Sequence, residues 1–392
     1  MRLADRLVRL KPSATMAVNA LALELARAGR DIISLSIGEP DFDTPPLARA
    51  AGIKAIEEGF TRYTAEAGIP ELRWAAAEYF NRNYGAGATM ENILIANGGK
   101  QALFNVFMAL LNPGDEVLIP APYWVSYPAM VEIAGGVPVV VRTGVEKNFK
   151  AGVEDLERHF TPKTRICVLN SPSNPTGMVY TTAEVDDLAA WAVDRQILLL
   201  SDEIYDQLVY APAAYSSLCA WWKKSPENFV VVNGVSKSFA MTGWRLGYVL
   251  ARADLILAAG KFQGHSTSNV CSIAQKAALA ALSGPMPELE FMRAAFEKRR
   301  RLTMEAVASW PGVRCPEPQG AFYVFPDVRQ LYTNELSGST TFCTFLLEQA
   351  GVALVPGEAF GDDHCIRISY ATEEKTLVRG LEKIRGVLFK KN

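Results

Sequence analysis

Apolar runs alternate with stretches of helical periodicity through the middle of the chain. Seven runs between Asn92 and Ala251 have the pattern of strands: NILIANGG, DEVLIPAP, GVPVVVRTG, RICVLNSP, ILLLSDE, FVVVNGVS and RLGYVLA. Most are separated by segments with apolar residues three and four apart, such as KQALFNVFMALL and TAEVDDLAAWAVDR. This alternation predicts an α/β fold in which helices cover both faces of a mainly parallel sheet.

The pattern changes after the last of these runs. The segment from about Ala253 to Trp310 has helical spacing, and AFYVFPDV, TTFCTFLLEQAG, CIRISYA and KTLVRGLEKIRGVL then mix strand and helix patterns. We therefore predict a larger domain over residues 46–285 and a smaller α/β domain over residues 286–392. Residues 1–45, which include the proline-rich loop GEPDFDTPP, are expected to pack against the smaller domain.

Composition narrows the class of protein. A chain of 392 residues with 49% hydrophobic content can bury a large core. The formal net charge is -2 and the basic residues are scattered, so no electrostatic footprint for nucleic acid or an anionic membrane is present. The start, MRLADRLVRLKP, has no apolar signal region, and no run of apolar residues is long enough to span a bilayer. We expect a cytoplasmic protein.

Cysteine and histidine spacing indicates no metal site. The three histidines (His159, His265, His364) lack metal-ligand spacing, and the six cysteines show no C-x-x-C pair. Most of the cysteines sit in apolar runs, which is typical of reduced thiols that pack in a core. They are Cys167, Cys219, Cys271, Cys315, Cys343 and Cys365.

Polar side chains follow five of the predicted strands at the points where the strands end. They are Gly98-Gly99-Lys100, Tyr123-Trp124, Asn170 to Asn174, Asp202 to Tyr205 and Ser236-Lys237. The carboxyl ends of parallel strands share one edge of a sheet, and ligands of open α/β sheets bind there. We therefore expect these five groups to lie together.

The turn GGKQALF opens a predicted helix. Its backbone N–H groups and positive dipole end could hold a phosphate, although a tight strand-to-helix turn has the same pattern. A nucleotide-triphosphate loop of the Walker A type is excluded, because position 94 is Leu94 instead of glycine and Gln101 follows the lysine.

Two charged residues, Asp202 and Lys237, come at or just after the ends of apolar strands. An unpaired charge that is buried there is costly. Asp202 therefore needs a cationic partner, or it serves as a helix N-cap or turn residue. Lys237 is either a desolvated nucleophile with a lowered pKa or a structural lysine that reaches water. Arg245, in TGWRLGY, fits a phosphate clamp or a surface ion pair.

One cofactor accounts for these residues together. Pyridoxal phosphate needs a lysine for its aldehyde, an acid at its pyridine nitrogen, donors to its phenolic oxygen and a cradle for its phosphate. GVSKSFAMTGWRLG resembles the lysine signature of class I pyridoxal-phosphate-dependent aminotransferases, and NSPSNPTG and SDEIY resemble the family's other two motifs. The likeness runs from KPSATMAVNA through AGIPELR and APYWVSYP to GAFYVFP and IRISYA. It is greatest toward the bacterial aspartate aminotransferases, some of which also accept prephenate.

The resemblance implies roles around the cofactor ring. Lys237 would bind the aldehyde covalently and later act as the general base, and Asp202 would pair with the pyridine nitrogen. Tyr205 and Asn174 would donate to the phenolic oxygen, and Trp124 would stack on the ring.

The resemblance also implies how the phosphate is held and how subunits assemble. The groups around the phosphate would be Gly98, Gly99, Lys100, Ser236 and Arg245. Tyr63, in RYTAEAGIP, would reach the phosphate of a neighbouring subunit, which implies a homodimer with shared active sites. The fold would be aminotransferase fold type I, whose seven-stranded sheet has one antiparallel member, with a smaller α/β domain.

The implied substrate site comprises Gly38, Trp124, Asn174, Arg367, Lys100 and Lys11. Arg367, in CIRISY, would bind the substrate's α-carboxylate as a planar bidentate donor, beside the Gly38 backbone. Lys100, with Lys11 closing over it, would bind the second carboxylate of a dicarboxylic substrate. His265 and Val270 stand where the family pattern has glutamine and proline, a departure that bears on substrate choice.

The sequence thus predicts transfer of the amino group of L-aspartate to 2-oxoglutarate by a ping-pong mechanism, with prephenate as a further acceptor. The alternatives are an aminotransferase for aromatic or alanine-type donors and a pyridoxal-phosphate C–S lyase. A transcription regulator with an aminotransferase-like domain would need a basic helix-turn-helix segment before KPSAT, and an NAD-binding protein would need G-x-G-x-x-G after a strand.

Overall fold

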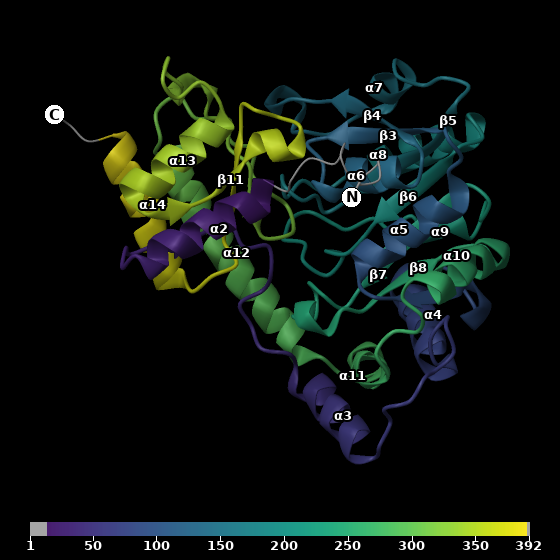
Figure 1. Ribbon diagram of the computed structural model, residues 1–392. Helices are drawn as coiled ribbons and strands as arrows, with labels where there is room; N and C mark the ends of the chain where they lie inside the picture. The colour runs from purple at the N-terminus through teal and green to yellow at the C-terminus, as the bar shows by residue number, and fades with distance from the viewer. Residues whose placement is uncertain (1–13, 390–392) are drawn as a thin grey trace, which may run out of the picture.

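The seven predicted strands form one sheet in the computed structural model, which describes residues 14–389 (Figure 1). They are β2 (Ile93–Ala96), β3 (Glu116–Ala121), β4 (Val137–Arg142), β5 (Thr164–Asn170), β6 (Leu198–Asp202), β7 (Phe229–Gly234) and β8 (Gly247–Leu250). The predicted α/β fold with a mainly parallel seven-stranded sheet is confirmed.

The strand order is β2-β8-β7-β6-β5-β3-β4. β8 is antiparallel to both of its neighbours, β2 and β7. All remaining neighbouring pairs of the sheet are parallel. Six strands therefore point the same way and end at a common edge, and β8 begins at that edge. This is the single antiparallel member that the family resemblance implied.

Helices cover both faces of the sheet. Successive side chains of a strand point to opposite faces, and apolar side chains on both faces need cover. In β7, Phe229 and Val231 face one apolar cluster, and Val230 and Val232 face the other. The first cluster includes α4 (Pro70–Tyr84), α8 (Thr182–Asp194) and α11 (Ser272–Ser283). The second includes α5 (Gly99–Leu110), α6 (Ser126–Ile133) and α10 (Ala253–Ser266).

Shorter elements surround the sheet. Helix α3 (Pro46–Glu57) packs against α11. The remaining helices of this part are α7 (Val153–Glu157) and α9 (Cys219–Trp222). Residues 14–389 also contain five 3-10 helices: η1 (Met90–Asn92), η2 (Val145–Lys147), η3 (Thr242–Trp244), η4 (Arg329–Leu331) and η5 (Gly357–Phe360).

The two ends of the chain build a second, smaller part. Its strands are β1 (Ile33–Ser34), β9 (Tyr323–Val324), β10 (Val352–Ala353), β11 (Val355–Pro356) and β12 (Ile366–Ser369). β1 pairs with β10 in parallel, and β12 pairs with β11 and β9 in antiparallel fashion. Its helices are α2 (Ala14–Arg27), α12 (Pro287–Ala308), α13 (Ser339–Ala350) and α14 (Glu374–Leu388).

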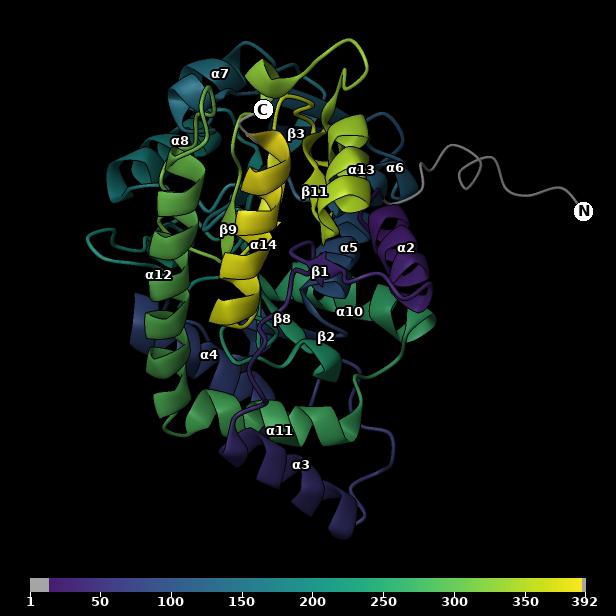
Figure 2. The same ribbon diagram turned by 90° about the vertical axis from the view of Figure 1, so that its left-hand side faces the viewer.

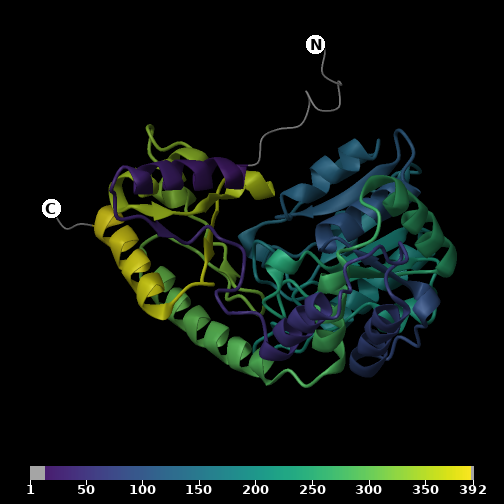
Figure 3. The ribbon, with the colours of Figure 1, turned by 60° about the horizontal axis from the view of Figure 1, so that its bottom comes forward.

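Figures 2 and 3 show how the parts are arranged. The long helix α12 runs beside α14 (Figure 2), and α2 lies with the C-terminal elements, where it contacts β10 and β11 (Figure 3). The predicted division at residues 45/46 and 285/286 stays a prediction. No helix within residues 14–389 is long and apolar enough to cross a bilayer.

The cysteines of the chain are free and mostly buried. Cys167, Cys219, Cys343 and Cys365 are buried among apolar side chains, as expected of core thiols. Cys271 is exposed, so the prediction of a packing role is wrong for this residue, which lies in the loop between α10 and α11.

Gly247 provides a test of how tightly β8 packs on the turn before α5. A Cβ atom on Gly247 would lie 2.5 Å from the backbone nitrogen of Gly99 and 2.6 Å from the carbonyl carbon of Gly98. We expect Gly247→Ala to lower the free energy of unfolding by about 1–3 kcal/mol, the usual cost of overpacking, measured by urea denaturation.

The matched control is Gly386→Ala in α14. Nothing lies within 4 Å of a Cβ atom there. Alanine favours a helix over glycine by about 0.5–1 kcal/mol, so this variant should be slightly more stable than the wild type. Equal denaturation midpoints for the two variants would contradict the tight packing described for Gly247.

Candidate active site

The polar groups that follow the strands do meet at the carboxyl edge of the sheet. Asn170 and Asp202 are register neighbours at the ends of β5 and β6, and the Asn170 side chain donates to the Asp202 carbonyl at 3.0 Å. The Lys100 ammonium lies 5.0 Å from the Trp124 ring centroid. The Trp124 ring packs edge-on against Tyr127, whose hydroxyl donates to the Asp202 carboxylate. Lys100, Trp124 and Asp202 are thus linked through Tyr127.

Lys237 lies on the turn that follows β7. Its Nζ donates to the Gly38 carbonyl at 2.5 Å, a contact that joins the large sheet to the N-terminal segment. Burial lowers the pKa of Lys237 from 10.5 to about 8, and the nearby Arg367 and Arg245 guanidinium groups add to this effect, although Glu39 opposes it. A useful fraction of the amine is therefore neutral, and nucleophilic, near neutral pH.

Asp202 ends β6 and is 6% exposed. The Tyr127 hydroxyl donates to its carboxylate at 2.6 Å. Burial raises the pKa of Asp202 to about 6, against the opposing effects of the Tyr127 hydrogen bond and the Lys237 charge. Within residues 14–389 Asp202 forms no ion pair, so those residues do not provide the close cationic partner that a buried carboxylate needs.

Arg367, on β12, is a buried arginine. Its guanidinium donates to the Asn174 side-chain oxygen at 2.9 Å and to the Ser36 carbonyl at 2.7 Å. It also stacks on the rings of Tyr323 and Phe360, at 4.5 and 5.1 Å from their centroids. The Nε atom is buried and has no hydrogen-bond partner, and no carboxylate pairs with this side chain within the described residues.

The space beside Arg367 is kept open by Gly38. A Cβ atom on Gly38 would lie 2.9 Å from the Tyr323 hydroxyl and 3.8 Å from an Arg367 nitrogen. The Tyr323 hydroxyl in turn lies 2.9 Å from the hydroxyl of buried Tyr205. A buried arginine with an unsatisfied donor, bordered by hydroxyl groups and glycine, suits a small carboxylate.

A second anion cradle lies at the start of α5. Gly98, the N-cap residue, has φ +83, a conformation that glycine adopts without strain. A Cβ atom there would lie 2.7 Å from an Arg245 guanidinium nitrogen. Arg245 itself has φ +53, which is uncommon for a residue with a side chain. The helix N-terminus and the guanidinium therefore face the same point, which suits a phosphate.

The cradle opens into a cavity of about 690 Å³. Its lining includes Asn97, Thr242 and Trp244 as well as Arg245. Ser236, assigned to the phosphate from the sequence, is 6% exposed on the same turn as Lys237. Lys100 points its ammonium at Trp124, and burial together with the Arg245 charge lowers the pKa of Lys100.

The loop that carries Gly38 is tied down on both sides. On one side, Arg299 of α12 pairs with Asp41 at 2.6 Å and stacks on Phe42. On the other side, Thr242 donates to Glu39 at 2.8 Å. These contacts hold the N-terminal segment against both parts of the molecule.

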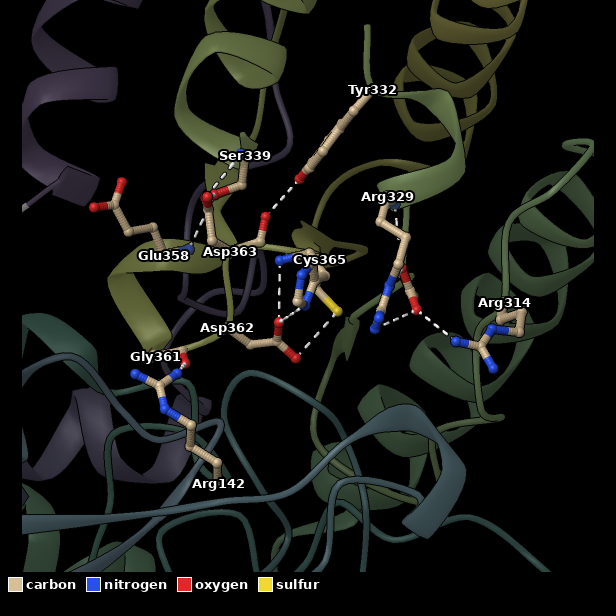
Figure 4. Close-up of polar contacts among 12 residues, drawn as sticks. Arg142, Arg314, Arg329, Tyr332, Ser339, Glu358, Gly361, Asp362, Asp363 and Cys365 are labelled. Carbon is tan, nitrogen blue, oxygen red and sulfur yellow. Dashed lines mark hydrogen bonds and ion pairs between the residues drawn. The ribbon is translucent and has the colours of Figure 1, made fainter. Parts of the chain in front are cut away.

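A polar network holds the segment that leads into β12 (Figure 4). Arg142 at the end of β4 donates to the Gly361 carbonyl at 2.9 Å. The Ser339 backbone N–H and hydroxyl both donate to Asp363, and the Tyr332 hydroxyl donates to the Asp363 carbonyl. Because Arg367 follows four residues later, the network fixes the strand that positions it.

Three residues singled out in the sequence lie apart from these contacts. Tyr63 is 92% exposed, His265 is exposed in the last turn of α10, and Val270 is fully buried in a core cluster. Lys11 lies outside the described residues. The roles inferred from the resemblance for Tyr63 and Lys11 stay predictions.

Sequence reasoning missed Tyr127 and Tyr323. Both stand in motifs that carry the family likeness, APYWVSYP and GAFYVFP. Neither follows a strand directly, so the strand-end pattern could not single them out.

The sequence and the structure were compared with those of known proteins. Residues 30–384 match the family model described as "Aminotransferase class I and II". The chain is 47% identical to an aspartate/prephenate aminotransferase from Cereibacter sphaeroides, with 98% of each chain covered. It is 45% identical to an aspartate aminotransferase from Geobacillus stearothermophilus, again with 98% of each covered. The solved structure of Thermus thermophilus aspartate aminotransferase with maleate superposes with a TM-score of 0.93 at 44% identity, covering 99% of this chain and all of the other.

The lowered pKa of Lys237 generates a pH-dependence prediction. A lysine of pKa about 8 is about one-tenth neutral at pH 7, some hundreds of times more than an ordinary lysine. The rate at which the cofactor-free protein captures pyridoxal phosphate should therefore rise about tenfold per unit below pH 8 and level off above it. Stopped-flow absorbance measures this rate. A rate that still climbs tenfold between pH 9 and 10 would contradict the buried position of the amine.

Proposed function

The chain belongs to the class I and II aminotransferases, and we propose that it transfers the amino group of L-aspartate to 2-oxoglutarate with the residues described above. Family membership makes it a pyridoxal-phosphate-dependent enzyme. The observation that carries the residue assignment is the pair formed by Lys237 and Asp202. An amine with a lowered pKa shares the site with a buried carboxylate that forms no ion pair within residues 14–389.

The donor set fits the cofactor. Lys237 supplies a neutral amine for the aldehyde, and Asp202 is a buried acceptor for a protonated pyridine nitrogen. The Tyr205 hydroxyl and the Asn174 amide would donate to the phenolic oxygen, and Trp124 would cover the ring. The phosphate would be held by Gly98, Gly99, Lys100, Ser236 and Arg245.

When bound, pyridoxal phosphate withdraws electrons from the Cα atom of the amino acid, so that the Cα proton becomes acidic. Lys237 Nζ would anchor the cofactor and, once the substrate amine has replaced it, would accept the Cα proton and hand it back as a general acid. Asp202 remains ionised and keeps the pyridine nitrogen protonated, which sustains the withdrawal. One residue thus serves first as the covalent anchor and then as the acid–base group.

Substrate orientation follows from Arg367. Its planar guanidinium binds the α-carboxylate bidentately and so fixes Cα relative to Lys237. The buried Nε donor, unpaired in the protein, is used in this contact. Lys100 is the candidate for the side-chain carboxylate of aspartate, with Lys11 closing over the same end.

The assembly and compartment are also proposals. Tyr63, 92% exposed in one subunit, would reach the phosphate of a second subunit in a homodimer with shared active sites. A cytoplasmic location accords with the reduced cysteines. The alternatives are an aminotransferase for aromatic or alanine-type donors and a C–S lyase. Ammonia and a keto acid formed without any acceptor would indicate the lyase.

Lys237→Ala tests the assignment of the amine. The variant loses both the covalent anchor and the proton carrier, so turnover should fall by about 10²–10⁴-fold or more. The cofactor should still bind through its phosphate and ring contacts, which absorbance after dialysis can measure. Near-normal turnover by this variant would refute the role of Lys237.

A panel of half-reactions tests the substrate. Aspartate, glutamate, alanine and phenylalanine serve as donors, with 2-oxoglutarate and prephenate as acceptors. A charged hydrogen bond is worth about 1.5–3 kcal/mol, so Lys100→Ala should lower kcat/KM for aspartate about 10–150-fold more than kcat/KM for alanine, whereas a role at the phosphate alone would lower both equally. Lys163→Ala, an exposed lysine at the opposite edge of the sheet, is the matched control and should behave as wild type. If aspartate is the poorest donor of the wild type, the proposed substrate is wrong.

A further inference from the structure

Asp206 is a buried carboxylate that the proposed mechanism does not use. It lies four residues after Asp202 and is 4% exposed. Five side chains donate to its two oxygens: Tyr79 at 2.5 Å, Tyr84 at 2.7 Å, Asn233 at 2.9 Å, Ser238 at 3.2 Å and Gln207 at 3.5 Å. Within residues 14–389 it forms no ion pair with a lysine, arginine or histidine.

Two of these donors bracket the lysine. Asn233 stands four residues before Lys237, near the end of β7, and Ser238 is the residue directly after it. Both are about 1% exposed, so neither has water as an alternative partner. The backbone turns sharply from Lys237 through Ser238, since the Ala240 N–H donates to the Lys237 carbonyl and Ala240 has φ +49. A turn that is strained in this way needs contacts from outside itself to stay in one conformation.

The other donors anchor Asp206 to a separate element. Tyr79 and Tyr84 lie on α4, whose apolar side chains pack under the sheet. Their short O–H···O distances are typical of an ionised acceptor. Burial raises the pKa of Asp206, whereas the hydrogen bonds from Tyr79 and Tyr84 favour its charged form. The carboxylate therefore connects a rigid helix to both sides of the lysine turn.

We propose that Asp206 is a positioning residue for Lys237, holding residues 233–238 in the conformation that directs the amine to the reacting carbon. It touches neither cofactor nor substrate and acts only through Asn233 and Ser238. The inference rests on the proposed function, in which Lys237 Nζ must move a proton between two defined atoms.

The neighbouring residue Glu203 provides a matched control. It is also a buried carboxylate, 1% exposed, and accepts from Ser201, Ser217 and the Leu218 backbone N–H. None of these donors belongs to residues 233–238. Asp206→Asn and Glu203→Gln are therefore the same chemical change in one polar region, but only the first alters the turn.

The experiment compares Asp206→Asn, Glu203→Gln and the milder Ser238→Ala as full-length proteins. Misplacement of a reacting group by about 1 Å costs about a hundredfold, so kcat of Asp206→Asn should fall about tenfold to a hundredfold while KM for aspartate changes little. Ser238→Ala should show a smaller loss of the same kind. Glu203→Gln is expected to be less stable but to keep its kcat.

A second readout does not depend on turnover. Reductive methylation of the cofactor-free protein with formaldehyde and cyanoborohydride, followed by peptide mass analysis, gives the pH midpoint of Lys237 reactivity. Loosening the turn admits water, so the midpoint should rise from about 8 toward 10.5 in Asp206→Asn. Loss of a negative charge alone would lower it instead.

The outcomes separate the two claims. A wild-type kcat and midpoint in Asp206→Asn, a downward shift, or equal changes in Asp206→Asn and Glu203→Gln would each overturn the positioning role. Absence of transamination in the wild type would instead refute the proposed function. The methylation midpoints do not depend on turnover, so they would still report whether Asp206 controls Lys237.

Discussion

The site depends on burying an amine, Lys237, and a carboxylate, Asp202, in one poorly hydrated space. Burial shifts both groups toward their neutral forms, lowering the pKa of Lys237 to about 8 and raising that of Asp202 to about 6. The first shift provides a nucleophile near neutral pH. The second leaves a carboxylate that gains by binding a cationic ring nitrogen. Each shift would disappear if water reached the edge of the sheet, so the chemistry rests on the packing that surrounds it.

That packing comes from distant parts of the chain. The large sheet supplies Asp202 and Lys237 from adjacent strands, β6 and β7. The N-terminal segment supplies the Gly38 carbonyl that receives the Lys237 amine, and β12 near the other end supplies Arg367. Contacts such as the pair between Arg299 and Asp41 hold these segments on the sheet. The smaller part of the molecule is therefore a component of the site.

Local sequence patterns were enough to predict the strands and the residues at their ends. They were not enough for features that depend on contacts between distant parts of the chain. Continuous apolar runs between helical stretches predicted all seven strands of the large sheet, and the rule that parallel strands end at one edge predicted that Asp202 and Lys237 would meet. Strand runs carry no direction, so the antiparallel β8 followed only from the family resemblance. Tyr127 and the two tyrosine donors to Asp206 come from helices far away in sequence, and no periodicity marks which hydroxyl will face a buried carboxylate. Exposed Cys271 shows another failure, because the packing role expected of the cysteines as a group does not hold for a residue in the polar stretch STSNVCS.

The central claim is that Lys237 alone carries the bond to the cofactor. Borohydride reduction of the enzyme incubated with pyridoxal phosphate, followed by peptide mass mapping, tests it most directly. The account predicts one equivalent of reduced cofactor, located on Lys237. Attachment at a different lysine, or no stable attachment at all, would contradict it.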